Sequence, residues 1–187
     1  MYNGDNSSPT LRNCSFTGNS DDLRGGGMYN YNFISPTVTN CILWGDSPDE
    51  IYNNSSNPTV TYSDVQGGWP DANNTNIDAD PLFVDPTNPD PNLRSLRLRL
   101  DSPCIDTGDS TALLAMPVYF DLDGKARYND IDSIDDTGSG SWEFIDMGAY
   151  EFQCSGIAGD INCDGVADFR DVATLCGNWL AGSEPEL

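Results

Sequence analysis

The chain has 187 residues and a formal net charge of −22, with 30 acidic residues, 8 basic residues and no histidine. Nucleic acid and acidic membranes repel so anionic a surface, which excludes both as expected partners. No run of 18 apolar residues is present, so the sequence predicts no membrane-spanning helix. The 18 glycines and 12 prolines, with abundant Asn, Asp, Ser and Thr, indicate an all-β protein with many turns.

A short repeat near the start of the chain predicts a solenoid. Residues 8–20 read SPTLRNCSFTGNS and residues 35–47 read SPTVTNCILWGDS, so both contain Ser-Pro-Thr, an apolar residue and Asn-Cys. A weaker third copy, NPTVTYSDVQGGW, covers residues 57–69. The shared prolines lie 27 and then 22 residues apart. A repeat of this length that is rich in strand-forming residues predicts one solenoid coil per copy.

Three columns of equivalent positions describe the coil. They are Leu11/Val38/Val60, Cys14/Cys41/Ser63 and Phe16/Leu43/Val65. The first column is out of phase with the other two in a two-residue alternation, so the chain must bend between them. Asn13 and Asn40 lie at this bend, and Asn adopts the left-handed backbone conformation more readily than most residues. We therefore predict a right-handed parallel β-helix, with coils over residues 8–152, Val38 facing inward and Thr37 facing outward.

Two motifs, one at the end of the first copy and one between the first two copies, carry a family resemblance. Phe16-Thr-Gly-Asn19 and Gly26-Gly-Met28 resemble the FxxN and Gly-Gly-apolar signatures of polymorphic outer-membrane protein repeats and their pectin-lyase-like β-helix relatives. The resemblance implies that residues 1–75 form parallel β-helix coils.

Four later segments together resemble the region called the choice-of-anchor Q domain. They read IDADPLF (77–83), SPCIDTGD (102–109), DLDGKAR (121–127) and DMGAYEF (146–152). The resemblance implies that residues 76–152 close the solenoid ahead of an attachment or sorting module, after which residues 153–158 form a linker.

The same region shows simple local patterns. We expect a short strand at 82–84, a turn at 121–124 and a last strand at 145–152. The alternating segment SLRLRL (95–100) predicts a strand that buries its leucines and turns Arg97 and Arg99 toward surrounding carboxylates.

The last segment, residues 159–187, contains the spacing of a calcium loop. Oxygen side chains occupy loop positions 1, 3, 5, 9 and 12, with glycine at position 6. The predicted ligands are Asp160, Asn162, Asp164, Asp168 and Asp171, with the backbone carbonyl of Val166. Calcium takes six to eight oxygen ligands, and this spacing wraps them about one point. The following residues predict an amphipathic helix whose apolar face contains Phe169, Val172, Ala173, Cys176, Trp179 and Leu180.

The final loop ligand differs from the usual EF-hand pattern, which has Glu where this chain has Asp171. With its Gly-Asp-Ile-Asn-Cys-Asp-Gly opening, the loop resembles a type I dockerin repeat, which implies Ca²⁺ as cofactor and a cohesin-like domain as partner. A dockerin normally has two such repeats and this sequence shows one, so either the single repeat stabilises a chain end without docking to a cohesin or the second repeat is missing from this fragment.

Several cysteines leave alternatives open. Cys14 and Cys41 are expected to lie one coil apart as buried thiols rather than as a disulfide. Cys154, Cys163 and Cys176 surround the calcium loop, and a bridge within this trio is compatible with the sequence, which does not choose the pair.

Two further groups of residues allow a functional and a structural interpretation. The acidic residues are Asp130, Asp132, Asp135 and Asp136, which either hold a second calcium or form a solvated acidic loop. The aromatic residues are Trp44, Tyr62 and Trp69, which form a sugar-stacking strip or pack near turns. Packing and a solvated loop are the commoner outcomes.

An enzyme and a binding module remain as competing functions. Elimination from a polysaccharide needs an Arg or Lys base beside calcium-binding carboxylates, and Arg24 is the one arginine between Arg12 and Arg94, with no acidic cluster in register. We therefore expect a non-catalytic C-terminal part of an extracellular or cell-surface protein, used for attachment or assembly on a cell surface or polysaccharide. The alternative is a fragment of a carbohydrate-active enzyme, a polysaccharide lyase or glycoside hydrolase. The chain begins without a signal peptide, so we expect a longer parent protein.

Overall fold

The computed structural model describes residues 1–4, 7–90, 94–114, 119–131, 134–140 and 145–153, together with Phe169 and Val172. The chain divides into two compact units, Met1–Phe152 and Gln153–Leu187. The architecture below is that of the first unit, which we call the body. No helix among the described residues is long and apolar enough to cross a membrane.

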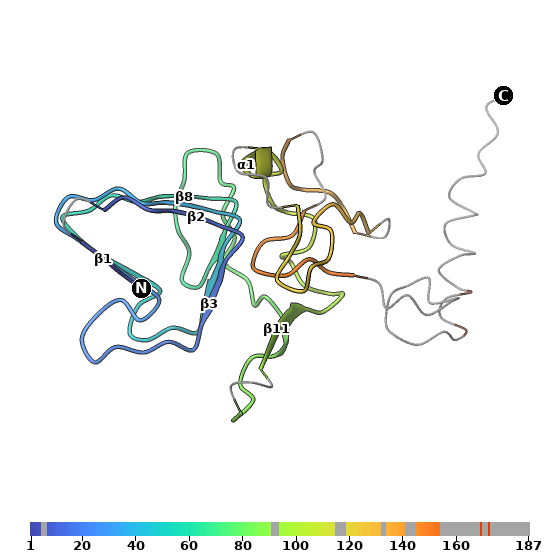
Figure 1. The fold of residues 1–187 in the computed structure, drawn as a ribbon, viewed down its shortest axis with the longest axis horizontal. Coiled ribbons are helices and arrows are strands. Elements are labelled where there is room, and N and C mark those ends of the chain that lie inside the picture. Colours follow the sequence, from blue (N-terminus) through green and yellow to red (C-terminus); the bar gives the residue numbers. More distant parts are fainter. Residues whose placement is uncertain are drawn as a thin grey trace. The chain divides into compact units, whose positions relative to one another are not determined.

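Three parallel sheets of three strands each form the first part of the body (Figure 1). The first sheet contains β1 (Tyr2–Asn3), β4 (Met28–Tyr31) and β7 (Ile51–Asn54). The second contains β2 (Thr10–Arg12), β5 (Thr37–Thr39) and β8 (Thr59–Thr61). The third contains β3 (Ser15–Thr17), β6 (Ile42–Trp44) and β9 (Asp64–Val65). Each coil of the chain gives one strand to every sheet, which is the architecture of a parallel β-helix.

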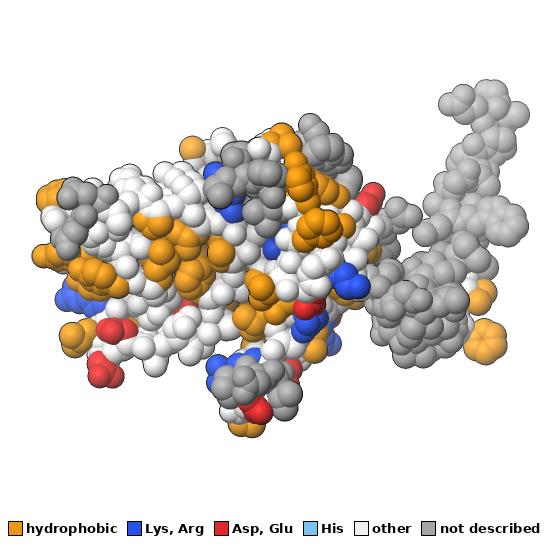
Figure 2. All heavy atoms as spheres, in the orientation of Figure 1, with side chains coloured by type: hydrophobic (Ala, Val, Ile, Leu, Met, Phe, Trp, Pro, Cys, Tyr) orange, Lys and Arg blue, Asp and Glu red, His pale blue; other side chains and the backbone are white. Residues whose placement is uncertain are grey.

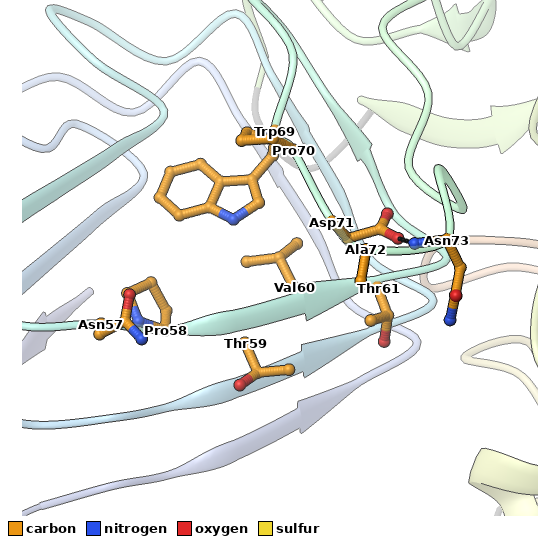
Figure 3. Close-up of a pocket in the computed structure, with 10 residues that line it drawn as sticks. All are labelled: Asn57, Pro58, Thr59, Val60, Thr61, Trp69, Pro70, Asp71, Ala72 and Asn73. Carbon is orange, nitrogen blue, oxygen red and sulfur yellow. Dashed lines mark hydrogen bonds between the residues drawn. The ribbon is translucent and has the colours of Figure 1, made fainter.

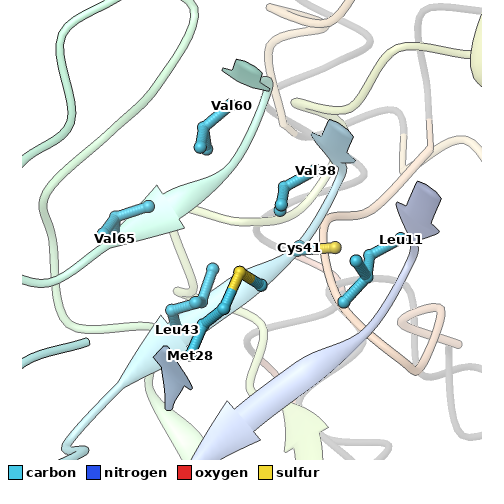
Figure 4. Close-up of a cluster of buried hydrophobic side chains, with 7 residues drawn as sticks. All are labelled: Leu11, Met28, Val38, Cys41, Leu43, Val60 and Val65. Carbon is cyan, nitrogen blue, oxygen red and sulfur yellow. The ribbon is translucent and has the colours of Figure 1, made fainter. Parts of the chain in front are cut away.

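The strand register confirms the predicted columns. Leu11 pairs with Val38 and Val38 with Val60, while Phe16, Leu43 and Val65 are paired in the same way. Figure 4 shows these inward side chains as one cluster with Met28 and Cys41. Val38 is fully buried and Thr37 is half-buried, as expected for neighbours on opposite faces of a strand.

The predicted bend is also confirmed. Asn13 and Asn40 have φ values of 50° and 54°, and Tyr62 has 47° at the equivalent place in the third coil. One left-handed residue turns the chain from the second sheet into the third and shifts the two-residue alternation by one position.

Two features of the coils were not predicted. Asn3, Asn30 and Asn53 form a ladder inside the first sheet, in which each side-chain amide bonds the next at 2.9 and 2.8 Å. A coil therefore begins at β1, before the residue 8 that the repeat suggested. Gly26 and Gly27 lie against the next coil, since a Cβ at Gly27 would stand 2.4 Å from Asp46 Oδ2. This close approach explains the Gly-Gly motif.

After the third coil, Ile77 adds a single parallel bridge to Asp64, and the described residues beyond it add no further strand to the three sheets, so the prediction of coils up to residue 152 is wrong. β10 (Phe83–Asp85) and β11 (Ser95–Leu98) pair in antiparallel fashion. The connection between them, residues 86–94, is shorter than the roughly dozen residues that a parallel return needs. Residues 145–153 form no strand, so the expected strand at 145–152 is also wrong. The helix α1 (Thr111–Leu114) is a single turn.

Residues 78–152, which we call the cap, pack against the outer face of the third sheet. The outward Ile42 of β6 belongs to a second buried cluster with Phe83, Leu98, Cys104, Ile105, Ile131 and Met147. Trp44 and Tyr62 pack against the same cluster. As expected, Leu96, Leu98 and Leu100 pack in or against this cluster. Arg97 lies on the surface and bonds Asp123 at 2.6 Å. The cap therefore covers the side of the coils as well as following them in sequence.

Candidate functional site

The predicted calcium ligands lie outside the described residues. These are Asp160, Asn162, Asp164, Val166, Asp168 and Asp171. Phe169 and Val172 are described as helical, and their side chains are 91% and 51% exposed. The calcium loop, its helix and the pairing of Cys154, Cys163 and Cys176 therefore stay predictions, and the chemistry that can be described is that of the body.

The cap contains a buried arginine, Arg127, which bonds the backbone of the DMGAYEF segment. Arg127 is 2% exposed, and its guanidinium donates to the carbonyl oxygens of Gly148 and Ala149 at 3.2 and 2.8 Å. Its Nη1 lies 3.8 Å from Glu151 Oε2, and both side chains are excluded from solvent. Burial lowers the pKa of Arg127, whereas the nearby carboxylates raise it. The arginine joins the DLDGKAR segment to the DMGAYEF segment.

Acidic groups beside this arginine organise the cap backbone. Asp146 Oδ1 accepts from the Asp106 N–H at 3.0 Å, and its Oδ2 accepts from the Phe152 N–H. Glu151 Oε2 accepts from the Asp146 N–H at 3.2 Å. Burial raises the pKa of Asp146 to about 8 and that of Glu151 well above its usual range. One arginine cannot neutralise both carboxylates, so this cluster favours a state in which one of them is protonated.

The cap docks on the coils through the bend residue Asn40. Its side-chain amide donates to the Asp109 carbonyl at 3.0 Å and accepts from the Asp109 N–H at 2.8 Å. Its own carbonyl accepts from the Gly148 N–H at 2.8 Å. Gly148 has a φ of 95°, and a Cβ there would lie 2.8 Å from both Ile42 and Ser15. These contacts explain the glycine of the DMGAYEF segment.

Cys14 and Cys41 are free thiols rather than a disulfide, as predicted, although Cys14 is only half-buried. Cys14, Cys41 and Cys104 are free among the described residues, and Cys41 packs in the coil interior with Cys14 beside it. A hydrogen bond from Cys41 is the main cause that lowers the pKa of Cys14 to about 7. Burial raises the pKa of Cys41. Cys104 lies against Asp64, with its sulfur 3.3 Å from Oδ2.

A hollow of about 550 Å³ lies at the exposed end of the third coil. Figure 3 shows the indole of Trp69 standing over Val60 and facing Pro58 across the hollow. Asn57, Thr59, Thr61 and Asn73 add amide and hydroxyl groups at its rim. An apolar floor with a few polar groups suits a small ligand or a sugar ring. We call this feature the Trp69 hollow.

The turn at residues 71–77 covers part of the edge of the third coil, near residues 60–63. Asp71 accepts hydrogen bonds from Asn73, Thr75 and Asn76. Thr75 and Asn76 then bond the strand edge, where Asn76 Nδ2 donates to the Val60 carbonyl at 2.8 Å. This turn takes the place of a fourth coil at the corner of the second and third sheets.

A second hollow contains two buried carboxyl groups, Asp46 and Glu50. Asp46 Oδ1 accepts from Asn19, and Glu50 Oε1 accepts from the Asp46 N–H at 2.9 Å. Burial, with a smaller contribution from the negative charge of Asp46, raises the pKa of Glu50 to about 7. These groups hold the turn that follows β6.

The aromatic residues divide into two roles. Trp44 and Tyr62 pack on the second buried cluster, so the structural interpretation is confirmed for them. Trp69 packs on the coil interior and also lines the hollow. Tyr2, Tyr29 and Tyr52 form an outer ladder whose rings meet edge to face at 5.5 and 5.4 Å, so they make no flat platform. On the face drawn in Figure 2, hydrophobic side chains form separate patches.

Three carboxylates meet elsewhere in the cap. One carboxylate oxygen from each of Asp106, Asp130 and Asp136 lies within 4.8 Å of the other two. Burial is the main cause that raises the pKa of Asp106 to about 7. Of the acidic residues singled out from the sequence, Asp130 and Asp136 are brought together, Asp135 is exposed and Asp132 lies outside the described residues. Asp106 was not singled out from the sequence, because the SPCIDTGD segment that contains it does not have the spacing of a metal-binding motif.

The fold and these sites define a parallel β-helix with a cap held by buried polar groups. None of the protein families, curated proteins and solved structures compared with the chain matches it.

Proposed function

We propose that the chain is a non-catalytic attachment module of an extracellular protein. In this proposal the coils and cap form a rigid body, and residues 159–187 form a calcium-dependent, dockerin-like end. The attachment target is a cohesin-like domain, a cell surface or a polysaccharide. The resemblance of the cap segments to a choice-of-anchor region supports the same role.

One observation carries the proposal: the spacing of oxygen side chains in residues 160–171. Calcium loops need oxygens at these positions and a glycine at the turn. The loop belongs to a second compact unit, Gln153–Leu187, so it is separate from the body.

The described chemistry of the body supports a structural role. Arg127, Asp146 and Glu151 are buried groups with shifted pKa values, which are often catalytic. Here they bond cap backbone groups. The Trp69 hollow supports polysaccharide as one target, because it combines an indole and prolines with amide and hydroxyl groups.

The test uses the full chain in calcium and in excess EDTA. We expect calcium-dependent capture by an immobilised type I cohesin, which the double variant Asp160→Ala, Asp171→Ala abolishes. Retention on insoluble polysaccharide should be lost in Trp69→Ala and kept in the double variant. Tyr31→Ala, which removes an exposed aromatic side chain outside the Trp69 hollow, is the control for the tryptophan.

Calcium binding itself can be followed by Trp179 fluorescence, with Trp44, Trp69 and Trp142 replaced by Phe. A saturable response below millimolar calcium is expected, with a weaker response to magnesium, which prefers a smaller octahedral shell. Absence of binding to either target would contradict the attachment role. Release of unsaturated or reducing-end sugar products would instead establish the carbohydrate-active enzyme.

A further inference from the structure

The acidic cluster of the cap brings together a residue of the SPCIDTGD segment and two residues that lie 24 and 30 positions further along the chain. Its members are Asp106, Asp130 and Asp136, and one carboxylate oxygen from each lies within 4.8 Å of the other two. Asp130 and Asp136 are exposed, so the cluster is open to solvent on their side. Exposed acidic groups often gather without binding an ion, so the cluster alone does not define a site.

The buried member of the cluster distinguishes it from a solvated acidic loop. Asp106 is 0% exposed, and the Ile131 N–H lies near enough to lower the pKa of its carboxyl group, but neither carboxylate oxygen accepts a hydrogen bond of normal geometry. A buried carboxylate with so little hydrogen bonding is strongly unfavourable, and the usual solutions are a proton, a paired cation or a metal. The other groups of the cluster are themselves acidic and offer no positive charge.

The backbone holds Asp106 in position. It has a φ of 53°, and its N–H donates to Asp146 at 3.0 Å. Its carbonyl accepts from the N–H groups of Thr137 and Gly138, both at 3.1 Å. The residues after Asp136 are therefore tied to Asp106 by two hydrogen bonds, so the two carboxylates are preorganised.

We propose that Asp106, Asp130 and Asp136 form a calcium site within the body. Oxygens on opposite sides of a bound calcium stand up to about 5 Å apart, because each lies about 2.3–2.6 Å from the ion. Magnesium, at about 2.0–2.1 Å, allows only about 4.2 Å and requires a regular octahedron. The upper limit of 4.8 Å on the ligand separations falls within the calcium range, and the solvent access of two ligands leaves room for water in the remaining positions, which calcium accepts in an irregular shell.

This site goes beyond the proposed function, since it does not involve residues 160–171. In the cap, calcium would have a structural role that is independent of the loop. The ion would neutralise Asp106 and join residues 102–109 to the residues around Asp130 and Asp136. An open site of three carboxylates belongs with extracellular calcium modules, whose dissociation constants are about 0.1–1 mM.

The test is equilibrium dialysis with radiolabelled calcium on the full chain carrying Asp160→Ala and Asp171→Ala, in buffered physiological salt. This background removes the predicted loop. We expect one saturable calcium per chain with a dissociation constant of about 1 mM or less. Adding Asp136→Asn should weaken binding at least about tenfold. Adding Asp135→Asn, which removes the same charge from an exposed neighbour outside the cluster, should change it less than about twofold.

A second readout is the melting temperature of the body. Calcium should raise it in the background chain and in Asp135→Asn, and should have no effect in Asp106→Asn or Asp136→Asn. The proposal is overturned if the background chain binds no calcium saturably, or if Asp135→Asn and Asp136→Asn weaken binding equally. Failure of the dockerin-like loop is separate, because it appears as loss of cohesin capture with cap binding intact.

Discussion

The coils and the cap bury comparable hydrophobic clusters but organise them differently. In the coils, each inward side chain lies beside its equivalent in the next coil, as Leu11, Val38 and Val60 do. In the cap, irregular segments are joined by buried polar groups centred on Arg127, Asp146 and Glu151. The first arrangement follows from a repeated apolar pattern, and the second from hydrogen bonds between distant motifs. The two regions should therefore respond to different mutations.

The largest expected effect is that of Val38→Asp in the coils. Val38 is fully buried between two equivalent residues, so an aspartate there places an unpaired charge in the stack. We expect a loss of about 4 kcal/mol or more in the free energy of unfolding, measured by urea denaturation. Thr37→Asp, on the other face of the same strand, should cost less than about 1 kcal/mol. Equal losses would mean that the inner and outer faces are exchanged.

The corresponding change in the cap is Arg127→Met. It keeps much of the side-chain volume but leaves buried carboxyl groups without their positive partner and the Gly148 carbonyl without its donor, while the Ala149 carbonyl keeps the Leu122 N–H. A loss of about 3–5 kcal/mol is expected at pH 7. Arg97→Met removes an exposed arginine paired with Asp123 and should cost about 1 kcal/mol or less. If both variants unfold at the same urea concentration, the buried network does not stabilise the cap.

The difference between these regions also shows what the sequence could predict. The columns and the bend could be read because Leu11, Val38 and Val60 recur in phase and Asn13 and Asn40 recur with them. The antiparallel pair of β10 and β11 could have been anticipated, since the connection between them is too short for another coil.

The cap network and the acidic cluster depend on contacts that no local pattern encodes. The Gly148 N–H bonds the Asn40 carbonyl although more than half of the sequence separates the two residues. Asp106 lies close to Asp136, and the chain between them is largely irregular. A single sequence shows each motif, but not which motifs face one another.

Alanine substitutions at Asn40 and Asn13 can be compared to measure how much the Asn40 side chain contributes to docking of the cap. Both have left-handed backbone conformations, but the side-chain amide of Asn13 has no hydrogen-bond partner, whereas that of Asn40 bonds Asp109 twice. Replacement by alanine should strain the backbone by about 1 kcal/mol at both positions. Asn40→Ala should cost about 1–3 kcal/mol more. Equal destabilisation in urea melts would indicate that the bonds to Asp109 contribute nothing.

A smaller effect is expected from pH, through Glu50 in the coils. Its pKa rises from 4.5 to about 7 because the group is buried, so the folded chain binds more protons than the unfolded chain between these values. The contribution of Glu50 to stability is therefore greatest below pH 4.5 and is lost as the pH rises toward 7. Glu50→Gln should remove about 1–3 kcal/mol of this pH dependence.

The control for this titration is Asp49→Asn, which changes the exposed neighbour of Glu50. Unfolding free energies of the wild type and both variants, measured from pH 4 to pH 8, give the comparison. The wild-type and Asp49→Asn curves should run parallel, while the Glu50→Gln curve should be flatter. A Glu50→Gln curve parallel to the wild type would contradict the burial of this carboxyl group.

Amide hydrogen exchange measured by NMR tests the lateral docking of the cap on the coils most directly. Residues 145–153 have no strand assignment, so protection of their amides must come from docking. We predict that the Gly148 and Ala149 amides, which donate to Asn40 and Ser15, exchange as slowly as those of the buried strands. Asn40→Ala should speed exchange at Asp109 and Gly148 while the Val38 amide stays protected. Exchange of Gly148 and Ala149 at the rate of exposed loops in the wild type would contradict the account.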